Sequence, residues 1–390
     1  MSRRELATAD WCAAPCDLCG AKDLETLGER RYRVRGRTRD FDMAFTDAVC
    51  PACGFVCAAQ RPDEAFLMAY YRDAHIGHRG GELHFDAEAR TEAVKRHVPA
   101  GGRVIEIGAN DGAFTTLLRE AGFDAFGFDP VEADEASSVA KGYLGANDAA
   151  PAPGEADAAV AYYVLEHVTD PRAWLSEVAR LVRPGGLVVL EVPNYETHPE
   201  DSLNMEHLLH FTPESLARLA RLCGLEPLEA GAGTVAYGQR LVAKKRDQVE
   251  PGVADPGAPD RARAAYDVAR QAREARAETA RRAAALAVDL AASPHTPVFL
   301  WGANEYAERA APLLAEYFNT VQVLDKSPSK IGGEFADLPS PVAHPDDTAA
   351  LNDAIFLVCS PNWNAQIAAE IAGRRLPALA VIDAVTGERL

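Results

Sequence analysis

The chain has 390 residues, with 58 acidic side chains against 40 lysines and arginines and a formal net charge of −18. This length predicts two or three domains of roughly 100–200 residues each. The acidic balance argues against a nucleic-acid partner, which would need a basic surface stripe, and none is visible outside the cluster from Arg30 to Arg39. We expect this cluster to be the exposed edge of a hairpin, with contact to a phosphorylated substrate as the alternative. No run approaches the ~20 apolar residues of a membrane span, and the N-terminus lacks an apolar secretion core, so we expect a cytoplasmic protein with no membrane partner.

Six of the eight cysteines lie within the first 57 residues, a clustering that in a reducing compartment favours metal over disulfides. Four of them form two C-x-x-C-G motifs, each able to aim two thiolates at one tetrahedral ion while the glycine takes a positive φ. We predict a zinc-binding domain over residues 1–62, with free thiols as the alternative. The predicted ligands are Cys16, Cys19, Cys50 and Cys53, whereas Cys12 and Cys57 fit neither motif.

A short helix ending near Tyr71 and a second helix over 88–97 are expected to flank a loop rich in glycine and histidine. Gly77, Gly80 and Gly81 give this loop hinge freedom, so we predict a lid over a pocket. Its irregularly spaced histidines are expected to be solvated, with a second metal site as the less favoured alternative.

The stretch 103–130 predicts a strand, a glycine turn, a helix and a second strand that ends in Asp129. Gly108 and Gly112 bracket a turn where backbone can approach a ligand without a Cβ in the way. Asp129 lies 21 residues after Gly108, about where a carboxylate can accept hydrogen bonds from both hydroxyls of a ribose. The pattern is that of a nucleotide-binding half-fold.

Two ligands compete for this turn. A dinucleotide needs G-x-G-x-x-G, but the second glycine is missing here and Asp111 would repel phosphate at the start of the helix. The acidic residues instead suit a cationic ligand with a ribose and no phosphate, as in S-adenosylmethionine; a decayed site is the remaining alternative. The predicted donor-binding residues are Glu106, Gly108, Asn110, Gly112, Asp129, Pro130, Asp148 and His167.

Alternating strands and helices over 63–246 predict a doubly wound α/β sheet. One strand, over 157–163, is followed by Glu166 and His167, which places them at the carboxyl edge of the sheet, where ligands bind. A late hairpin over 225–230 and 235–243 is expected to form an antiparallel edge. Further elements are expected at 132–140 (helix), 171–182 (helix), 183–186 (turn), 187–192 (strand) and 212–223 (helix).

Residues 247–294 are predicted to be a linker rich in proline, glycine and acidic residues, followed by one long helix over 261–292 whose charges form a solvated face. Residues 295–390 repeat the strand, glycine and helix pattern and predict a second, smaller Rossmann-like domain. Its turn at 302–304 is too weak a fingerprint to name a ligand.

This arrangement resembles the three-domain, S-adenosylmethionine-dependent sugar C-methyltransferases, which act on nucleotide-linked 4-keto-6-deoxy sugars. The resemblance spans nearly the whole chain. It implies an N-terminal zinc-binding domain, a class I methyltransferase domain and a Rossmann-like C-terminal domain. It is carried by the four motif cysteines, EIGANDG (106–112), GFDP (127–130), EVPNY (191–195), Glu206-His207 and LDKSPSKIGG (324–333).

In that family, the histidine of a Tyr-x-Glu-His motif is the proposed base that removes the acidic proton next to the sugar ketone. Glu206 and His207 match the last two positions of the motif, but Asn204 stands at the tyrosine position. The glycine-rich segment that follows the motif also differs here, as TVAYGQRL, and the alanine-lysine-glycine run of the last domain is absent.

The chemistry of His207 can also be argued from residue type alone. Methylation of carbon needs a base of near-neutral pKa, which histidine supplies, and the adjacent Glu206 can orient it or stabilise its charge. His210 would share the face of His207 if the segment were helical. The alternative is an ordinary histidine at a helix start with a capping glutamate. His167 is a second candidate base.

These patterns together predict an S-adenosylmethionine-dependent methyltransferase with catalytic residues His207, Glu206 and His210. The predicted acceptor is a nucleotide-linked keto-deoxy sugar or a related small metabolite, C-methylated through an enolate. Methylation of oxygen or nitrogen is the alternative, as is a methyltransferase-like scaffold without acceptor chemistry. The sequence leaves the choice between monomer and dimer open.

Overall fold

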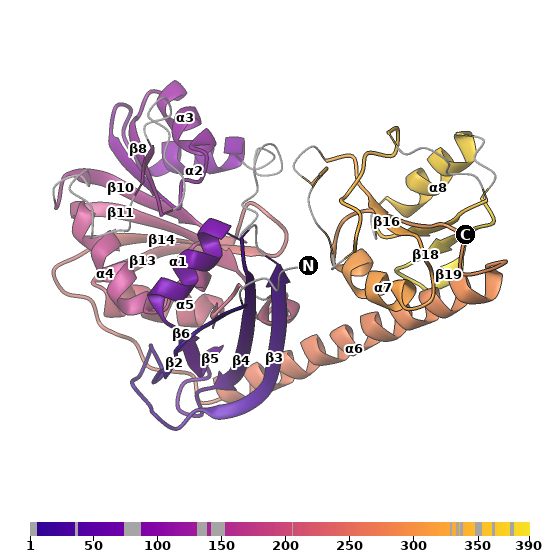
Figure 1. The fold of residues 1–390 in the computed structure, drawn as a ribbon. Coiled ribbons are helices and arrows are strands. Elements are labelled where there is room, and N and C mark those ends of the chain that lie inside the picture. The colour runs from indigo at the N-terminus through magenta and orange to yellow at the C-terminus, as the bar shows by residue number, and fades with distance from the viewer. Residues whose placement is uncertain are drawn as a thin grey trace. The chain divides into compact units, whose positions relative to one another are not determined.

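The computed structural model describes residues 6–35, 38–73, 87–130, 139–141, 153–204, 206–327, 330–332, 335, 338–347, 353–360, 363–374 and 378–390. They form two compact units, residues 1–269 and 270–390, which are described separately (Figure 1). The predicted lid and Asp148 lie outside the described residues.

The N-terminal sheet of the first unit is built around the long hairpin of β3 (Glu25–Arg35) and β4 (Asp40–Val49), drawn in indigo in Figure 1. Strand β4 alternates, so that Phe41, Met43 and Phe45 are buried on one face. The sheet is completed by β1 (Leu6–Thr8), β5 (Val56–Ala58) and β12 (Leu209–His210), while β2 (Trp11–Ala13) pairs with β6 (Gln60–Pro62). Because β12 comes from beyond residue 200, the predicted zinc-binding and methyltransferase segments share one sheet.

The central sheet has seven strands in the order β13-β14-β11-β10-β7-β8-β9. Strand β14 is antiparallel to both of its neighbours, and the other strand pairs are parallel, which confirms the doubly wound sheet with an edge hairpin. The strands are β7 (Arg103–Ile107), β8 (Asp124–Asp129), β9 (Val139–Lys141), β10 (Ala156–Tyr162), β11 (Val182–Pro193), β13 (Leu225–Ala232) and β14 (Gly238–Lys245).

Two local predictions in this domain are wrong in the part that the structure describes. Val139 and Ala140, the end of the helix expected over 132–140, belong to β9, a short parallel strand beside β8, and residues 132–138 lie outside the described residues. The expected turn over 183–186 is the start of β11, which joins the sheet through a register shift opposite Ala156 and Ala158. The helices are α1 (Glu64–Asp73), α2 (Ala87–His97), α3 (Ala113–Glu120), α4 (Pro171–Leu181) and α5 (Pro213–Leu222).

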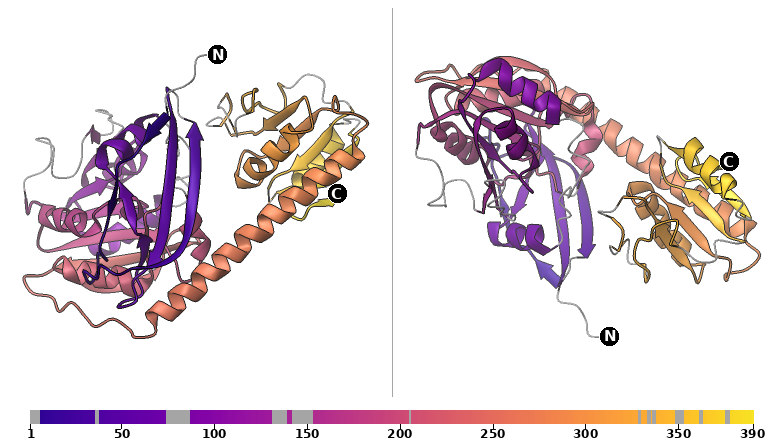
Figure 2. Two further views of the ribbon diagram at one scale, coloured as in Figure 1. Left: turned by 60° about the horizontal axis from the view of Figure 1, so that its bottom comes forward. Right: turned by 90° about the horizontal axis from the view of Figure 1, so that it is seen from above.

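Helix α6 (Ala258–Leu290) is a single helix of 33 residues, seen at its full length in Figure 2. The boundary between the two compact units falls within it. Tyr266 is buried in the first unit, and Ala283 and Ala287 are buried in the core of the second. The helix therefore has buried apolar residues as well as the predicted solvated face: those in its first part are buried in the first unit, and those in its last part are buried in the second.

The second unit is a parallel sheet in the order β16-β15-β17-β18, closed by the antiparallel strand β19. Its elements are β15 (Val298–Trp301), α7 (Glu305–Ala315), β16 (Val321–Leu324), β17 (Ile355–Val358), α8 (Asn364–Gly373), β18 (Ala380–Asp383) and β19 (Glu388–Arg389). Across the described part of the chain, no helix combines the length and hydropathy that a membrane span requires.

Candidate functional site

The turn between β7 and α3 brings Gly108, Asn110, Gly112 and Asp129 together. The first three have positive φ angles of 76°, 48° and 77°. The backbone N–H of Asn110 donates to Oδ2 of Asp129 at 3.0 Å, so the carboxylate at the end of β8 faces the turn. Pro130 follows at the edge of the sheet. Helix α3 begins after Gly112, which provides no capping side chain.

Gly108 and Glu106, which precede this helix, have packing partners that the sequence did not reveal. A Cβ on Gly108 would lie 2.3 Å from Cγ2 of Val164, so packing also requires a glycine there. Glu106 is buried and accepts a hydrogen bond from Oγ1 of Thr115 at 2.5 Å. Burial raises the pKa of Glu106 to about 8, against the opposing effects of Thr115 and Arg90.

Arg90 on α2 is a buried cation beside this turn that sequence reasoning missed. Its guanidinium lies 4.4 Å from the ring centroid of Tyr162, and Nε donates to Thr234. Its Nη2 has no hydrogen-bond partner among the described residues. The available signal was its place on the buried stripe of α2, between Ala87 and Val94. A buried charge that lacks a full set of partners is costly, so this position is suited to an anionic ligand group.

A second group of functional side chains follows β11. Nδ1 of His207 lies 2.9 Å from Oδ2 of Asp201, and the side chain of His207 is only 9% exposed. Burial lowers the pKa of His207, but the charge and hydrogen bond of Asp201 outweigh it, so that the pKa is raised above its usual 6.5. Burial opposes ionisation of Asp201, yet His207 holds its pKa below the usual range. Sequence reasoning missed Asp201.

Asp201, and not the adjacent Glu206, forms the hydrogen bond that orients the ring of His207. Glu206 acts on His207 by its charge, which contributes to the raised pKa, while its Oε1 accepts from the hydroxyl of Tyr70 on α1 at 2.6 Å. Asn204, at the family's tyrosine position, caps a tight turn by accepting from the N–H of Glu206.

The helical face expected for His207 and His210 is also absent from the described residues. His210 lies in β12, paired with Val56 of β5, and its Nδ1 is 3.8 Å from Asp201. Helix α5 begins only at Pro213, behind a capping box of Thr212 and Ser215, so neither histidine is a helix-start residue. The helix predicted over 212–223 is α5, and both histidines lie before it.

His167 lies beside His207, with ring centroids 4.7 Å apart, and its Nδ1 is 3.1 Å from the carbonyl of Glu206. Next to it, Glu166 is fully buried, and neither of its carboxylate oxygens has a hydrogen-bond partner among the described residues. Burial raises the pKa of Glu166 to about 8. The nearest ligand atoms of Glu166, His167 and His207 lie within 4.8 Å of one another, close enough to bind one metal ion. Without a metal, protonated His207 can supply the positive charge beside Glu166.

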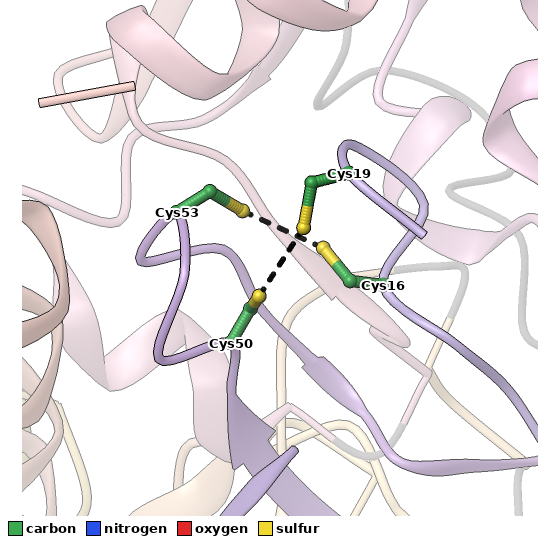
Figure 3. A group of neighbouring side chains, drawn as sticks. All are labelled: Cys16, Cys19, Cys50 and Cys53. Atoms are coloured by element: carbon green, nitrogen blue, oxygen red, sulfur yellow. Dashed lines mark hydrogen bonds between the residues drawn. The ribbon is translucent and has the colours of Figure 1, made fainter. Parts of the chain in front are cut away.

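The four predicted zinc ligands converge from two knuckles (Figure 3). The sulfurs of Cys16 and Cys53 are 3.5 Å apart, as are those of Cys19 and Cys50, and all four lie within 4.8 Å of one another. Four thiolates about 2.3 Å from a tetrahedral Zn²⁺ would be roughly 3.8 Å apart, so the geometry fits that ion. The following residues, Gly20 and Gly54, have the expected positive φ.

Comparison with known proteins identifies the central domain. The family described as "Methyltransferase domain" matches residues 83–230. The ubiquinone biosynthesis O-methyltransferase of Thiobacillus denitrificans is 30% identical over 155 residues, which cover 33% of this chain and 67% of that protein. The chain belongs to the class I, S-adenosylmethionine-dependent methyltransferases. The ubiquinone biosynthesis O-methyltransferase of Methylococcus capsulatus is 31% identical over 124 residues, and the chain spans only about half, 52%, of the length of that protein.

Two solved methyltransferases are also similar to this methyltransferase. A 1,6-didemethyltoxoflavin-N1-methyltransferase of Burkholderia thailandensis is 17% identical, with a TM-score of 0.39 over 50% of this chain and 96% of that chain. The magnesium protoporphyrin IX methyltransferase of Synechocystis is 14% identical, with a TM-score of 0.36 over 47% of this chain and 100% of that chain. The first 82 residues and those after 230 lie outside the family match.

Proposed function

We propose that this methyltransferase C-methylates a small keto compound, of the nucleotide-linked deoxy-sugar class that the sequence resembles, after His207 has removed a proton. The carrying observation is the buried pair of His207 and Asp201 after β11. It shares the carboxyl edge of the sheet with the Asp129 turn, and this is the edge where ligands of such sheets bind.

The donor would lie across the turn that follows β7. S-adenosylmethionine supplies an electrophilic methyl group on a sulfonium. Asp129 would accept hydrogen bonds from the ribose hydroxyls, while Arg90, with Nη2 unpartnered among the described residues, would bind the amino-acid carboxylate. The start of α3, where Asp111 accepts from the N–H of Ala113, would lie beside the bound donor. The roles of Gly108, Asn110, Gly112 and Pro130 are to shape this turn.

The proton would leave the acceptor carbon for Nε2 of His207, because Nδ1 is bound to Asp201. Asp201 then stabilises the imidazolium, and the carbanion of the enolate forms the new carbon–carbon bond with the methyl group as the carbon–sulfur bond breaks. The donor sulfur would thereby become a neutral thioether, and His207 would return its proton to solvent. The rate should rise with pH through a midpoint above 6.5, since only neutral His207 is a base.

Zinc would be held by Cys16, Cys19, Cys50 and Cys53 and have a structural role. Four thiolates leave no open position for water, so the ion would fold the N-terminal segment and perform no chemistry. Elemental analysis should give one zinc per chain. A second equivalent, lost on replacing Glu166, would instead place a metal beside His207 and remove the case for a histidine base.

O-methylation is the second candidate, because the matched relatives are named O-methyltransferases. It also needs a base but forms no enolate. The deciding measurement is exchange of the acceptor's α-proton with deuterated solvent when only S-adenosylhomocysteine is bound. We expect exchange in the wild type, none in His207→Ala, and a loss of turnover of about 10²- to 10⁴-fold in that variant. Methylation of oxygen without such exchange would establish the second candidate.

A further inference from the structure

The loop that carries His207 receives side-chain hydrogen bonds from the N-terminal sheet. The hydroxyl of Tyr32 donates to the carbonyl of Leu203 at 2.5 Å. Arg30 donates from Nη1 to the carbonyl of Asn204 at 2.5 Å, and from Nη2 to the carbonyl of His207 itself at 3.2 Å. Three carbonyls within five residues are thus bound by one strand that lies more than 170 positions earlier in the sequence.

The guanidinium of Arg30 is held rigidly. Its side chain is fully buried and forms a close ion pair with Asp47 of β4, in which Nε and Nη2 both donate. Asp47 also accepts from the hydroxyl of Tyr266 on α6 at 3.0 Å, and the guanidinium lies 4.8 Å from the ring centroid of Phe45. With its orientation fixed on the Asp47 side, the planar fork presents its remaining N–H groups to the loop.

The strand pattern separates Arg30 from the other arginines around it. Residues 30 and 32 lie on the same face of β3 because side chains alternate, whereas Arg31 points the other way and its side chain is 76% exposed. Arg30, the first residue of the basic cluster Arg30–Arg39, is therefore buried, whereas the sequence predicted an exposed hairpin edge. Burial of a charged group inside the sheet is costly unless all its donors are used, and the ion pair with Asp47 does not use them all.

We propose that Arg30 is a positioning residue for the methyl-transfer reaction: it fixes the 203–207 loop so that the His207 imidazole stays against Asp201 and faces the acceptor. This inference rests on the proposed function, in which His207 is the base. It makes the N-terminal sheet a part of the catalytic site and not an independent metal-binding appendage. An imidazole displaced by about 1 Å is enough to slow a proton transfer about 10²-fold.

The test compares Arg30→Met with Arg61→Met in the full zinc-loaded chain. Arg61 is also a buried arginine, on β6, and is paired with Asp17 at 2.5 Å. Its backbone contact is the carbonyl of Thr169, outside the His207 loop. The first readout is an NMR pH titration of the His207 imidazole, assigned by its loss in His207→Gln. The carboxylates around that ring are Asp201, Glu166 and Glu206. Two further titratable groups bear on it: His167, whose ring lies beside it, and His210, which faces Asp201.

We expect the midpoint of the His207 titration to move to lower pH in Arg30→Met and to stay in place in Arg61→Met, because only the former loosens the contact with Asp201. Affinity for S-adenosylhomocysteine should be unchanged in both. Turnover of any acceptor that the wild type methylates should fall about 10²-fold in Arg30→Met, and Arg30→Lys should recover part of it. An unchanged titration and turnover in folded Arg30→Met, or equal losses in Arg61→Met, would overturn the proposal.

Two further variants keep the outcomes distinct. Tyr32→Phe removes one hydrogen bond from the same loop and carries the test if Arg30→Met does not fold; its titration must shift in the same direction. His207→Ala tests the proposed function alone. If that variant retains full activity, the base assignment fails, while the titration still reports whether Arg30 positions the ring.

Discussion

The turns at 108–110 and 302–304 have the same sequence, Gly-Ala-Asn, and each follows the first strand of a parallel sheet. In both, an aspartate at or just after the end of the next strand accepts a hydrogen bond from a backbone N–H of the turn. Asp129 does so at 3.0 Å and Asp325 at 2.8 Å. By sequence and by this contact, the two turns are near copies.

They differ in what fills the space beyond the turn. Asn304 caps α7 by accepting from the N–H groups of Tyr306 and Ala307, and its amide donates to the carbonyl of Cys359. A Cβ on Gly302 would lie 2.7 Å from that carbonyl oxygen. Lys330 approaches Asp325 at 3.6 Å. The second turn is thus closed by its own chain.

The first turn is two residues longer before its helix begins, and Gly112 gives α3 no side-chain cap. The carboxylate of Asp111 accepts from the N–H of Ala113 at the start of this helix, and the Nη2 of nearby Arg90 has no hydrogen-bond partner among the described residues. The two turns thus differ at the start of the helix and not in their Gly-Ala-Asn sequence, and we expect only the first to bind the methyl donor.

The strongest test of this difference is a pair of aspartate variants. Asp129→Ala should lose the hydrogen bonds to the donor's ribose and weaken S-adenosylmethionine binding by about 3 kcal/mol, on the order of 100-fold. Asp325→Ala should leave donor affinity unchanged, because its turn is closed. Calorimetric titration measures both, and equal losses in the two variants would refute the contrast.

A matched pair of arginines gives the next largest effect. Arg90→Met should weaken S-adenosylmethionine by about 2 kcal/mol, because a carboxylate loses its cationic partner. Arg374 lies over Trp301 in the second unit much as Arg90 lies over Tyr162, but Glu370 and Asp346 already neutralise it, so Arg374→Met should have no effect on the donor. 5′-Methylthioadenosine, which lacks the carboxylate, should bind Arg90→Met as well as it binds the wild type.

The sequence was sufficient for features that depend on local pattern. Apolar runs ending in glycine predicted β7 and β15, and the C-x-x-C-G spacing predicted cysteines whose sulfurs the structure brings together. Residue type alone singled out His207 as a candidate base, and the structure places its ring beside Asp201. Each of these signals lies within a few neighbouring residues.

The missed features depend on contacts between distant segments. Asp201 pairs with His207 because the short helical turn Pro199–Leu203 folds the chain back, and the adjacent Glu206 is drawn to Tyr70 instead. The pairing of β12 with β5 places His210 in a strand, so it does not share a helical face with His207. Local propensity cannot report such pairings, because tertiary contacts override it.

Glycine variants should sharpen the comparison through stability. Alanine at Gly108 or Gly302 should cost about 1–2 kcal/mol from positive φ alone. At Gly108 the neighbour is a methyl of Val164, so adding Val164→Ala should relieve the remaining clash. At Gly302 the neighbour is a backbone carbonyl, which no side-chain substitution can remove. Denaturant unfolding that shows equal costs and no relief would contradict this distinction.

The smallest expected effect concerns the strand position two residues before each glycine. The first sheet has Glu106 there, and the second has Leu300. Burial raises the pKa of Glu106 from its usual 4.5 to about 8, so the folded state holds a proton that the unfolded state releases. Its contribution to stability is therefore fully present below pH 4.5 and is lost as the pH rises through about 8, by at most about 1.4 kcal/mol per pH unit.

Glu106→Gln keeps an oxygen for Thr115 and should flatten the pH dependence of the free energy of unfolding between pH 5 and 8, though not abolish it, since Glu166 has a similarly raised pKa. Leu300→Ala should lower stability equally across that range. An unchanged slope in Glu106→Gln would mean that this carboxyl is ionised in the folded protein, with Arg90 as its counterion and no longer available to the donor.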